Sequence, residues 1–424
     1  MASDEDKKDS SHREPDFVRY HLVPPLFVVF FPIACQFLVV LPRDDGTPIQ
    51  LSHLMGNAFV WKCLLVLAIW SLFFLWIPSK KCYGSTTTYG ETPEYVDNGM
   101  LFYLSSTFGF CALCYWYPQI ATEIYDNMPS MIGALNVTAL MACAGLLLQA
   151  KYAQQSSEII PDFPILYDFY RGRELHPKIL GVRVKQLACS RMGMITWQIL
   201  PLAYLFTAIQ RDGGQINYGF LVSVALQSIY IAKFYWWESG YFCTLDMILD
   251  RVGFYLVWGC LVYIPSFYCF SSYYFVTHPP SISPQTAAII FLVGLIVIYF
   301  NYDVDYQKEL FCKTNGDCQI WGQQPTFIRT EYHTTEGLRR SKLLTSGWWG
   351  IAWHINYTFE LLLALAWNAP GYGLGIWPFM YNIFLFFLLV HRVFRDEEKC
   401  SKKYGRSWAK YREQVPYNLI PYVW

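Results

Sequence analysis

The feature that most constrains this 424-residue chain is a series of long apolar stretches that recur along almost its whole length. A helix needs about 20 apolar residues to cross the ~30 Å hydrocarbon core of a bilayer. The stretches that approach or reach this length cover residues 22–41, 58–78, 100–120, 131–150, 188–209, 218–237, 252–275, 286–302, 346–367 and 371–390. The sequence therefore predicts an all-α integral membrane protein with about ten transmembrane helices.

The composition agrees with a membrane protein. Hydrophobic residues make up 54% of the chain and charged residues 15%, whereas soluble domains carry roughly 25% charged residues. The formal net charge is zero, so no nucleic-acid partner is indicated. Thirteen cysteines are scattered, many of them within apolar stretches, and their spacing predicts neither a metal site nor a disulfide framework.

Lys and Arg are unevenly distributed between the segments that join the apolar stretches. With the N-terminus placed in the cytosol, alternate joining segments and the two tails hold nearly all of them, and the opposite side holds only Arg43 and Arg211. Because positive residues concentrate on the cytosolic side of membrane proteins, both termini are predicted to be cytosolic. Two long cytosolic segments, 151–187 and 303–345, then lie on the same side as the C-terminal tail.

The last part of the chain, residues 391–424, is densely charged and aromatic. Arg392 and Asp396 are four residues apart and would share a helix face, while Pro416 and Pro421 end any helix. Cations suit phosphates, tyrosine rings suit stacking, and a carboxylate suits a ribose or an amide. The segment therefore suits an anionic, aromatic ligand, although a solvated, positively charged tail after a last membrane helix has a similar composition.

The tail HRVFRDEEKCSKKYGRSWAKYREQVPYNLIPYVW resembles the C-terminal signature of the NADPH-using sterol reductases, the family of the 7-dehydrocholesterol and C-14 sterol reductases. The segments WWESGY, DRVGFYLVWGCLVYIPSFY, GRELHPKI and SKLLTSGWWGIAWHINY extend the resemblance upstream to about residue 160. Cys260 stands where the C-14 reductases carry Asp, so the pattern is most similar to the plant-type sterol Δ7-reductases.

The resemblance implies NADPH as cofactor, a sterol from the lipid bilayer as substrate, and a multi-pass protein of the endoplasmic reticulum membrane. It indicates neither a metal nor a nucleic acid, and protein partners stay unknown. We accordingly divide the chain into a polar tail (1–21), N-terminal transmembrane helices (22–150) and a reductase core (151–424). The cytosolic NADPH pocket is expected within 303–424.

By their places in the family motifs, the implied cofactor contacts are Lys308, Leu344, Trp349, Asn356, Tyr357, Asp396, Cys400, Lys403, Tyr404 and Tyr411. The ammonium group of Lys308 suits a phosphate, and the rings of Trp349 and Tyr411 suit stacking. Two positions depart from the family: Cys312 and Trp353 stand where members commonly carry Arg. Losing two guanidinium groups would weaken the hold on phosphate unless other cations replace them.

The implied reaction is reduction of the C7–C8 double bond of a 5,7-diene sterol. Protonation at C8 leaves an allylic cation, and hydride then adds at C7. The acid must be a hydroxyl, or a carboxyl group whose pKa burial has raised. Tyr268 is the first candidate, and Asp396 or Glu238 could supply or relay the proton. Tyr268 equally fits an aromatic residue at the membrane interface, and Glu238 equally fits a loop between two membrane helices.

Three other interpretations stay open. A C-14 or side-chain sterol reductase would share the same motifs, and Cys260 argues against it. The motif KYG with the following VP also resembles the isoprenylcysteine carboxyl methyltransferases, which are shorter and lack GRELHPKI. A sterol-binding scaffold with a decayed cofactor site would explain Cys312 and Trp353, and such a scaffold would not be protected from protease by NADPH.

Overall fold

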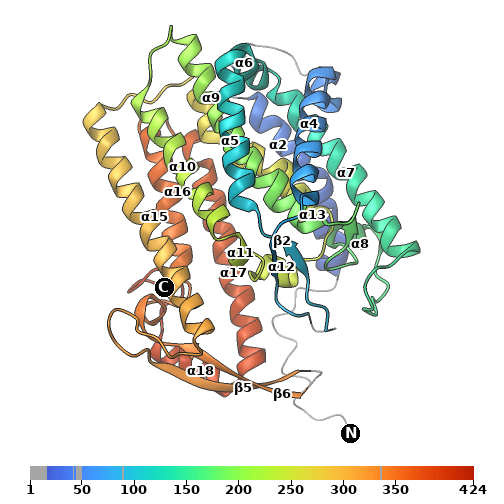
Figure 1. The fold of residues 1–424 in the computed structure, drawn as a ribbon, viewed down its shortest axis with the longest axis vertical. Helices are drawn as coiled ribbons and strands as arrows, with labels where there is room; N and C mark the ends of the chain where they lie inside the picture. Colours follow the sequence, from blue (N-terminus) through green and yellow to red (C-terminus); the bar gives the residue numbers. More distant parts are fainter. Residues whose placement is uncertain (1–16, 42, 44–49, 88–89, 335–336) are drawn as a thin grey trace. The chain divides into compact units, whose positions relative to one another are not determined.

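The computed structural model describes residues 17–41, 43, 50–87, 90–334 and 337–424. They form two compact units: unit 1 combines Met1–Ala203 with Tyr241–Cys269, and unit 2 combines Tyr204–Gly240 with Phe270–Trp424. Both units are mainly helical (Figure 1). Most of the predicted polar tail, residues 1–16, lies outside the described residues.

By length and composition, eight helical segments of the described chain can cross a membrane. They are Val18–Val40, Leu51–Trp76, Gly99–Trp116, Met128–Tyr152, Gln186–Arg211, Phe254–Phe275, Pro284–Lys313 and Trp377–Tyr404. Large apolar side chains such as Val66 and Phe108 are about two-thirds exposed on them, at 67% and 68%, which suits side chains that face lipid. The prediction of a mostly helical, multi-pass membrane protein is confirmed.

Unit 1 consists of helices and two short hairpins. Its helices are η1 (Val18–Leu22), α1 (Val23–Pro25), η2 (Leu26–Phe30), α2 (Phe31–Val40), α3 (Leu51–Met55), α4 (Ala58–Trp76), α5 (Gly99–Trp116), α6 (Gln119–Asp126), α7 (Met128–Tyr152), α8 (Ile165–Arg171), η3 (Gln186–Gly193), α12 (Leu245–Leu249), α13 (Phe254–Trp258) and η4 (Gly259–Tyr268). Its antiparallel hairpins are β1 (Lys81–Tyr83) with β2 (Glu94–Val96) and β3 (Lys178–Ile179) with β4 (Val182–Arg183). Helices α9 (Met194–Arg211) and α11 (Glu238–Tyr241) contain the boundaries between the units. The wide turns of η4 contain Pro265, whose missing N–H breaks the regular α-helical ladder.

The GRELHPKI motif in unit 1 is held by a close approach of two backbone segments. Gly172 has a positive φ of 85°, and a Cβ atom there would lie 2.4 Å from the backbone of Val252. A Cβ atom on Gly253 would lie 2.1 Å from the backbone nitrogen of Gly172. The N–H of Val252 donates to the carbonyl oxygen of Glu174 at 3.0 Å. Only glycine fits both facing positions, so this part of the motif serves the fold.

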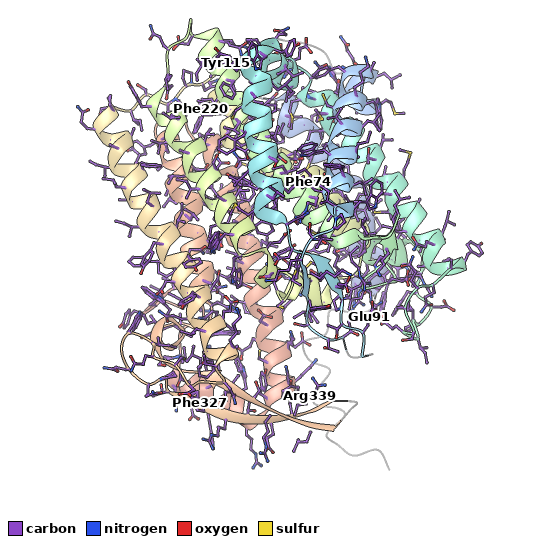
Figure 2. All side chains as sticks on the ribbon, in the orientation of Figure 1. Phe74, Glu91, Tyr115, Phe220, Phe327 and Arg339 are labelled. Carbon is purple, nitrogen blue, oxygen red and sulfur yellow. The ribbon has the colours of Figure 1, made fainter. Side chains whose placement is uncertain are left out.

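Unit 2 contains α10 (Tyr218–Trp236), α14 (Phe270–Phe275), α15 (Pro284–Lys313), η5 (Gly347–Gly350), α16 (Ile355–Asn368), η6 (Ala369–Gly371), η7 (Trp377–Phe379), α17 (Met380–Tyr404) and α18 (Arg406–Gln414). Strands β5 (Phe327–Thr334) and β6 (Gly337–Leu344) form an antiparallel hairpin that pairs Phe327 with Leu344. Helices α10, α15 and α16 pack against one another. The hairpin and α18 lie at one end of the unit (Figure 1), and Figure 2 shows Phe327 and Arg339 on the two ends of the hairpin.

Three helices of unit 2 differ from the predicted membrane stretches. Helix α15 continues beyond residue 302 to Lys313, and this polar part keeps a buried face that includes Val304, Gln307 and Phe311. Helix α16 begins at Ile355, not at residue 346, since Gly347 adopts a positive φ of 63° and a short 3₁₀ turn follows it. Its 14 residues span about 21 Å, less than the hydrocarbon core. The charged segment after residue 390 extends α17 to Tyr404.

Candidate functional site

The ten cofactor residues expected from the sequence all belong to unit 2. Lys308 is near the end of α15, Leu344 ends β6, and Trp349 is in η5. Asn356 and Tyr357 form the first turn of α16. The remaining five are Asp396, Cys400, Lys403 and Tyr404 near the end of α17 and Tyr411 on α18. They come from six elements, and the contacts between these elements decide whether they form one site.

Trp349 links three of these elements. Its Nε1 donates to the carbonyl oxygen of Val304 on α15 at 2.9 Å, and its carbonyl oxygen accepts from the hydroxyl of Tyr411 at 3.3 Å. The ammonium group of Lys308 lies 3.9 Å from the centre of the indole ring. Such a cation–π contact stabilises by about 0.5–2 kcal/mol, depending on exposure. Lys308, Trp349 and Tyr411 therefore form one contiguous surface.

The C-terminal segment holds the start of α16. The N–H groups of Trp353 and His354 donate to the carbonyl oxygens of Tyr417 and Asn418 at 3.2 and 3.1 Å. The hydroxyl of Thr358 donates to the carbonyl oxygen of Leu419. Because N–H groups at the start of a helix have no acceptor within it, these bonds fix the first turn of α16. The tail is thus part of the folded unit and not a solvated end.

His354 is buried between the tail and α17. Its ring stacks on Tyr357, with centroids 4.5 Å apart and an interplanar angle of 7°. Its Nε2 lies 3.5 Å from Oδ2 of Asp396 but has no hydrogen-bond partner among the described residues. Burial, together with the positive charges of Lys308 and Arg412, lowers the pKa of His354 from 6.5 to about 3. His354 is therefore neutral, and its contact with Asp396 is not an ion pair.

The polar atoms at this end of the unit fit a dinucleotide. Oδ1 of Asn356 is buried and has no hydrogen-bond partner in the described part of the chain, like Nε2 of His354. Since buried polar atoms nearly always have a partner, both are available to a ligand amide or hydroxyl. Asp396 is only 8% exposed. The ammonium group of Lys403, 4.0 Å from the ring centre of Tyr332, provides a second cation for phosphate.

The two departures from the family pattern have different surroundings. Trp353 is 5% exposed, donates from Nε1 to Oδ1 of Asn418 at 2.9 Å and packs against Trp408. The guanidinium group of Arg412 lies 5.3 Å from its ring centre, so a cation remains beside this position. Cys312 is exposed.

The three proposed catalytic residues lie on different elements. Tyr268 belongs to unit 1, at the end of η4, where its ring meets Trp197 edge-to-face at 4.9 Å. Glu238 and Asp396 belong to unit 2. Glu238 is 2% exposed and begins α11. Their roles in proton transfer stay predictions.

Sequence reasoning missed His354, Arg412 and Asn418 as parts of this site. His354 follows Trp353 in a motif that resembles the family, but its burial against Tyr357 and Asp396 depends on the fold. Arg412 and Asn418 lie in the tail, where nothing in the residue spacing indicates that the chain turns back onto α16. The contact is long-range, so only the folded structure reveals it.

The buried, neutral state of His354 predicts a loss of stability in acid. Below pH 6.5 the unfolded chain takes up a proton at this residue and the folded chain does not, so the free energy of unfolding falls with pH. At pH 5 the loss from this residue reaches about 2 kcal/mol. Thermal unfolding in detergent between pH 7 and pH 5 should show a smaller destabilisation for His354→Gln than for the wild type. If the unfolding temperatures of the two proteins fall equally between pH 7 and pH 5, this account is contradicted.

The chain also matches known proteins over most of its length. The profile of the ergosterol biosynthesis ERG4/ERG24 family matches residues 27–424. The 7-dehydrocholesterol reductase of Arabidopsis thaliana is 36% identical over 367 residues, which are 86% of this chain and 85% of that protein. The 7-dehydrocholesterol reductase of Xenopus laevis is 34% identical over 432 residues, which cover 94% and 89% of the two chains.

A relative named for a different sterol double bond is nearly as similar. The Delta(14)-sterol reductase of Dictyostelium discoideum is 31% identical over 350 residues, which are 81% of this chain and 73% of that protein. The match to one family along almost the entire chain sets aside the methyltransferase interpretation. The chain belongs to the ERG4/ERG24 family of sterol reductases, and it is a multi-pass membrane oxidoreductase that acts on a sterol double bond.

Proposed function

We propose that this chain is an NADPH-dependent sterol Δ7-reductase, which reduces the C7–C8 double bond of 5,7-diene sterols in sterol biosynthesis. The proposal rests chiefly on one observation. Cations, aromatic rings and two buried polar atoms without partners converge at one end of unit 2, at and beside the positions that the family motifs assign to the cofactor. The names of the relatives from Arabidopsis thaliana and Xenopus laevis support the Δ7 position.

Different residues at this end of unit 2 would contact different chemical groups of the cofactor. Lys308 and Lys403 would contact phosphate groups, and Asn356 and Asp396 would hydrogen-bond the amide or a ribose. The rings of Trp349, Tyr357, Tyr404 and Tyr411 and the apolar side chains of Leu344 and Cys400 would line the remaining surface. When bound, NADPH supplies the hydride.

The protein itself must supply the proton and exclude water. The apolar helices take the sterol from the bilayer and keep the reacting carbons dry. We propose the hydroxyl of Tyr268 as the first acid, with Asp396 or Glu238 supplying or relaying the proton.

We further propose ten membrane crossings, which add α10 and α16 to the eight candidate helices. The distribution of Lys and Arg favours cytosolic termini, which puts the cofactor end of unit 2 in the cytosol. The family's role in ergosterol biosynthesis supports residence in the endoplasmic reticulum membrane. The tail (1–21), the N-terminal helices (22–150) and the reductase core (151–424) remain our proposed division of the chain.

Reduction at C14 is the second candidate, because a Delta(14)-sterol reductase is among the relatives. Cys260 favours the Δ7 position. Its Sγ lies 3.3 Å from Sγ of Cys189, so this part of unit 1 brings two cysteine sulfurs together where the C-14 pattern carries a carboxyl group.

An assay with two diene sterols distinguishes the Δ7 and C-14 candidates. Membranes that contain the chain, supplied with NADPH and either a 5,7-diene or an 8,14-diene sterol, should remove the conjugated-diene absorbance of the 5,7-diene and give a product two mass units heavier. Reduction of the 8,14-diene alone would favour the C-14 interpretation. Absence of reduction with both sterols, by well-expressed protein, would favour a scaffold with a decayed cofactor site.

Lys308 tests the proposed phosphate contact. The Lys308→Met variant should raise the KM for NADPH about tenfold or more, since a hydrogen bond to a charged group contributes about 1.5–3 kcal/mol. The matched control is Lys313→Met. Lys313 is an exposed cation on the same helix, and its ammonium group lies 2.5 Å from the carboxylate of Glu309. Equal KM values for the two variants would show that Lys308 does not contact the cofactor.

A further inference from the structure

The end of the GRELHPKI motif is explained neither by the packing of its glycine nor by the proposed cofactor site. Its last two residues, Lys178 and Ile179, form strand β3, and the chain turns back through Leu180 and Gly181 into β4. The sequence predicts this segment to be a polar, cytosolic one. The turn nevertheless carries apolar side chains on the surface of unit 1, with Leu180 66% exposed and Ile179 36% exposed.

The turn combines two features that are both unfavourable in water. Leu180 and Gly181 have positive φ angles of 51° and 82°, as the two central residues of a tight hairpin turn require. Glycine and asparagine accept this conformation readily, whereas leucine adopts it at a steric cost. The same leucine exposes an apolar side chain, which is unfavourable in water. An apolar environment around the turn would offset this cost.

Hydrogen bonds tie the turn to the ends of two candidate membrane helices, α4 and α7. Nε1 of Trp76, the last residue of α4, donates to the carbonyl oxygen of Leu180 at 3.1 Å. Nε2 of Gln149, in the last turn of α7, donates to the carbonyl oxygen of Lys178 at 3.1 Å. Gln155, just beyond α7, accepts from the N–H of Lys178 at 2.7 Å. Because membrane helices end where the hydrocarbon core meets water, these bonds hold the turn at that level.

The turn also lies on the outer surface of unit 1, where lipid surrounds membrane helices. Trp76 is 55% exposed, and Tyr152, the last residue of α7, is 85% exposed. Tryptophan and tyrosine gather at the membrane–water interface because they join an apolar ring to a polar group. The turn is bonded to this exposed surface and continues it beyond the ends of the two helices.

The charges around the turn suit an anionic layer. Lys178, at the base of the turn, and Lys151, near the end of α7, are both exposed. Arg183 is opposite Lys178 in the hairpin and pairs with Glu91 at 2.9 Å. Lysines beside exposed apolar side chains are the combination that binds the headgroup layer of a membrane with anionic lipids.

We propose that the β3–β4 turn docks on the lipid bilayer. Ile179 and Leu180 insert into the headgroup layer, and Lys178 and Lys151 contact anionic phospholipids. The partner is the same bilayer that surrounds α4 and α7, because the turn is bonded to the ends of both helices at their exposed surface. Docking of the turn holds the GRELHPKI motif at a fixed depth. It depends neither on the identity of the sterol nor on the cofactor.

Photolabelling from the lipid side tests the docking on the wild-type, full-length protein. Nanodiscs of phosphatidylcholine and phosphatidylserine, with a diazirine near the glycerol backbone of each lipid, are irradiated, and the labelled residues are located by mass spectrometry. Ile179 and Leu180 should carry lipid adducts. The matched control is Leu338, an exposed leucine of the β5–β6 hairpin. It should carry none, because its hairpin packs on α18 and, through Tyr332, on Tyr404 at the end of α17.

The opposite result is equally clear. Adducts confined to the membrane helices, with residues 178–183 as free of label as Leu338, would overturn the proposal and would place the turn in water or against another protein.

A substitution of Leu180 tests the insertion of its side chain. Leu180→Asp keeps a residue type that tolerates the left-handed conformation and puts a charge where the apolar side chain inserts. Adducts at 178–183 should be lost, while adducts on α4 remain and show that the protein is folded. If the adducts on α4 are lost as well, Leu180→Asn, which also tolerates this conformation, replaces the variant. Adducts at 178–183 that persist in the folded variant would refute the insertion.

A substitution of Lys178 tests the contact with anionic lipid. Lys178→Gln should lower the share of phosphatidylserine among the adducts at the turn about fivefold, since a lysine near an anionic surface contributes about 1 kcal/mol. The control Lys410→Gln, which removes an exposed lysine of α18, should leave this share as it is in the wild type. An unchanged share in Lys178→Gln would contradict the proposed contact with anionic lipid.

Discussion

The candidate site depends on hydrogen bonds between the C-terminal segment and the start of α16. The carbonyl oxygens of Tyr417 and Asn418 accept from the N–H groups of Trp353 and His354, which precede the helix and find no acceptor within it. These bonds fix the place of His354 and of Asn356 two residues later. The C-terminal segment contacts both the first turn of α16 and the buried part of α17, and without it both would lose these contacts.

A second constraint is the cost of placing polar groups among apolar helices. The cations Lys308 and Lys403 belong to the end of unit 2 that carries the β5–β6 hairpin and α18, where phosphate groups could reach them. The charged residues within the bundle, such as Lys233, Asp305 and Glu360, are joined by hydrogen bonds: Nζ of Lys233 donates to Asp305 and Asn301, and Nδ2 of Asn301 donates to Glu360. The proposed reduction of a sterol ring double bond by NADPH requires both environments, apolar helices for the sterol and a polar end for the dinucleotide.

The sequence predicts the parts of this fold that depend on composition, and misses those that depend on long-range contacts. Hydropathy locates eight membrane helices because lipid demands long apolar stretches. It misplaces the start of α16, where the positive φ of Gly347 interrupts an otherwise apolar run. Lys233 lies within the predicted stretch 218–237, but its hydrogen-bonded link to Glu360 runs through Asn301 on a third helix, and no residue spacing indicates that link.

The central claim is that hydride from the cofactor and a proton from the protein are added across the C7–C8 bond. The most direct measurement uses purified protein, a 5,7-diene sterol and NADPH carrying deuterium in the transferred C4 position, with the label located in the product by mass spectrometry and NMR. The account predicts one deuterium at C7 from the cofactor and, in a parallel reaction in D₂O with unlabelled NADPH, one deuterium at C8 from solvent. A reduced product without cofactor deuterium, or with the label at another position of the sterol, would contradict it.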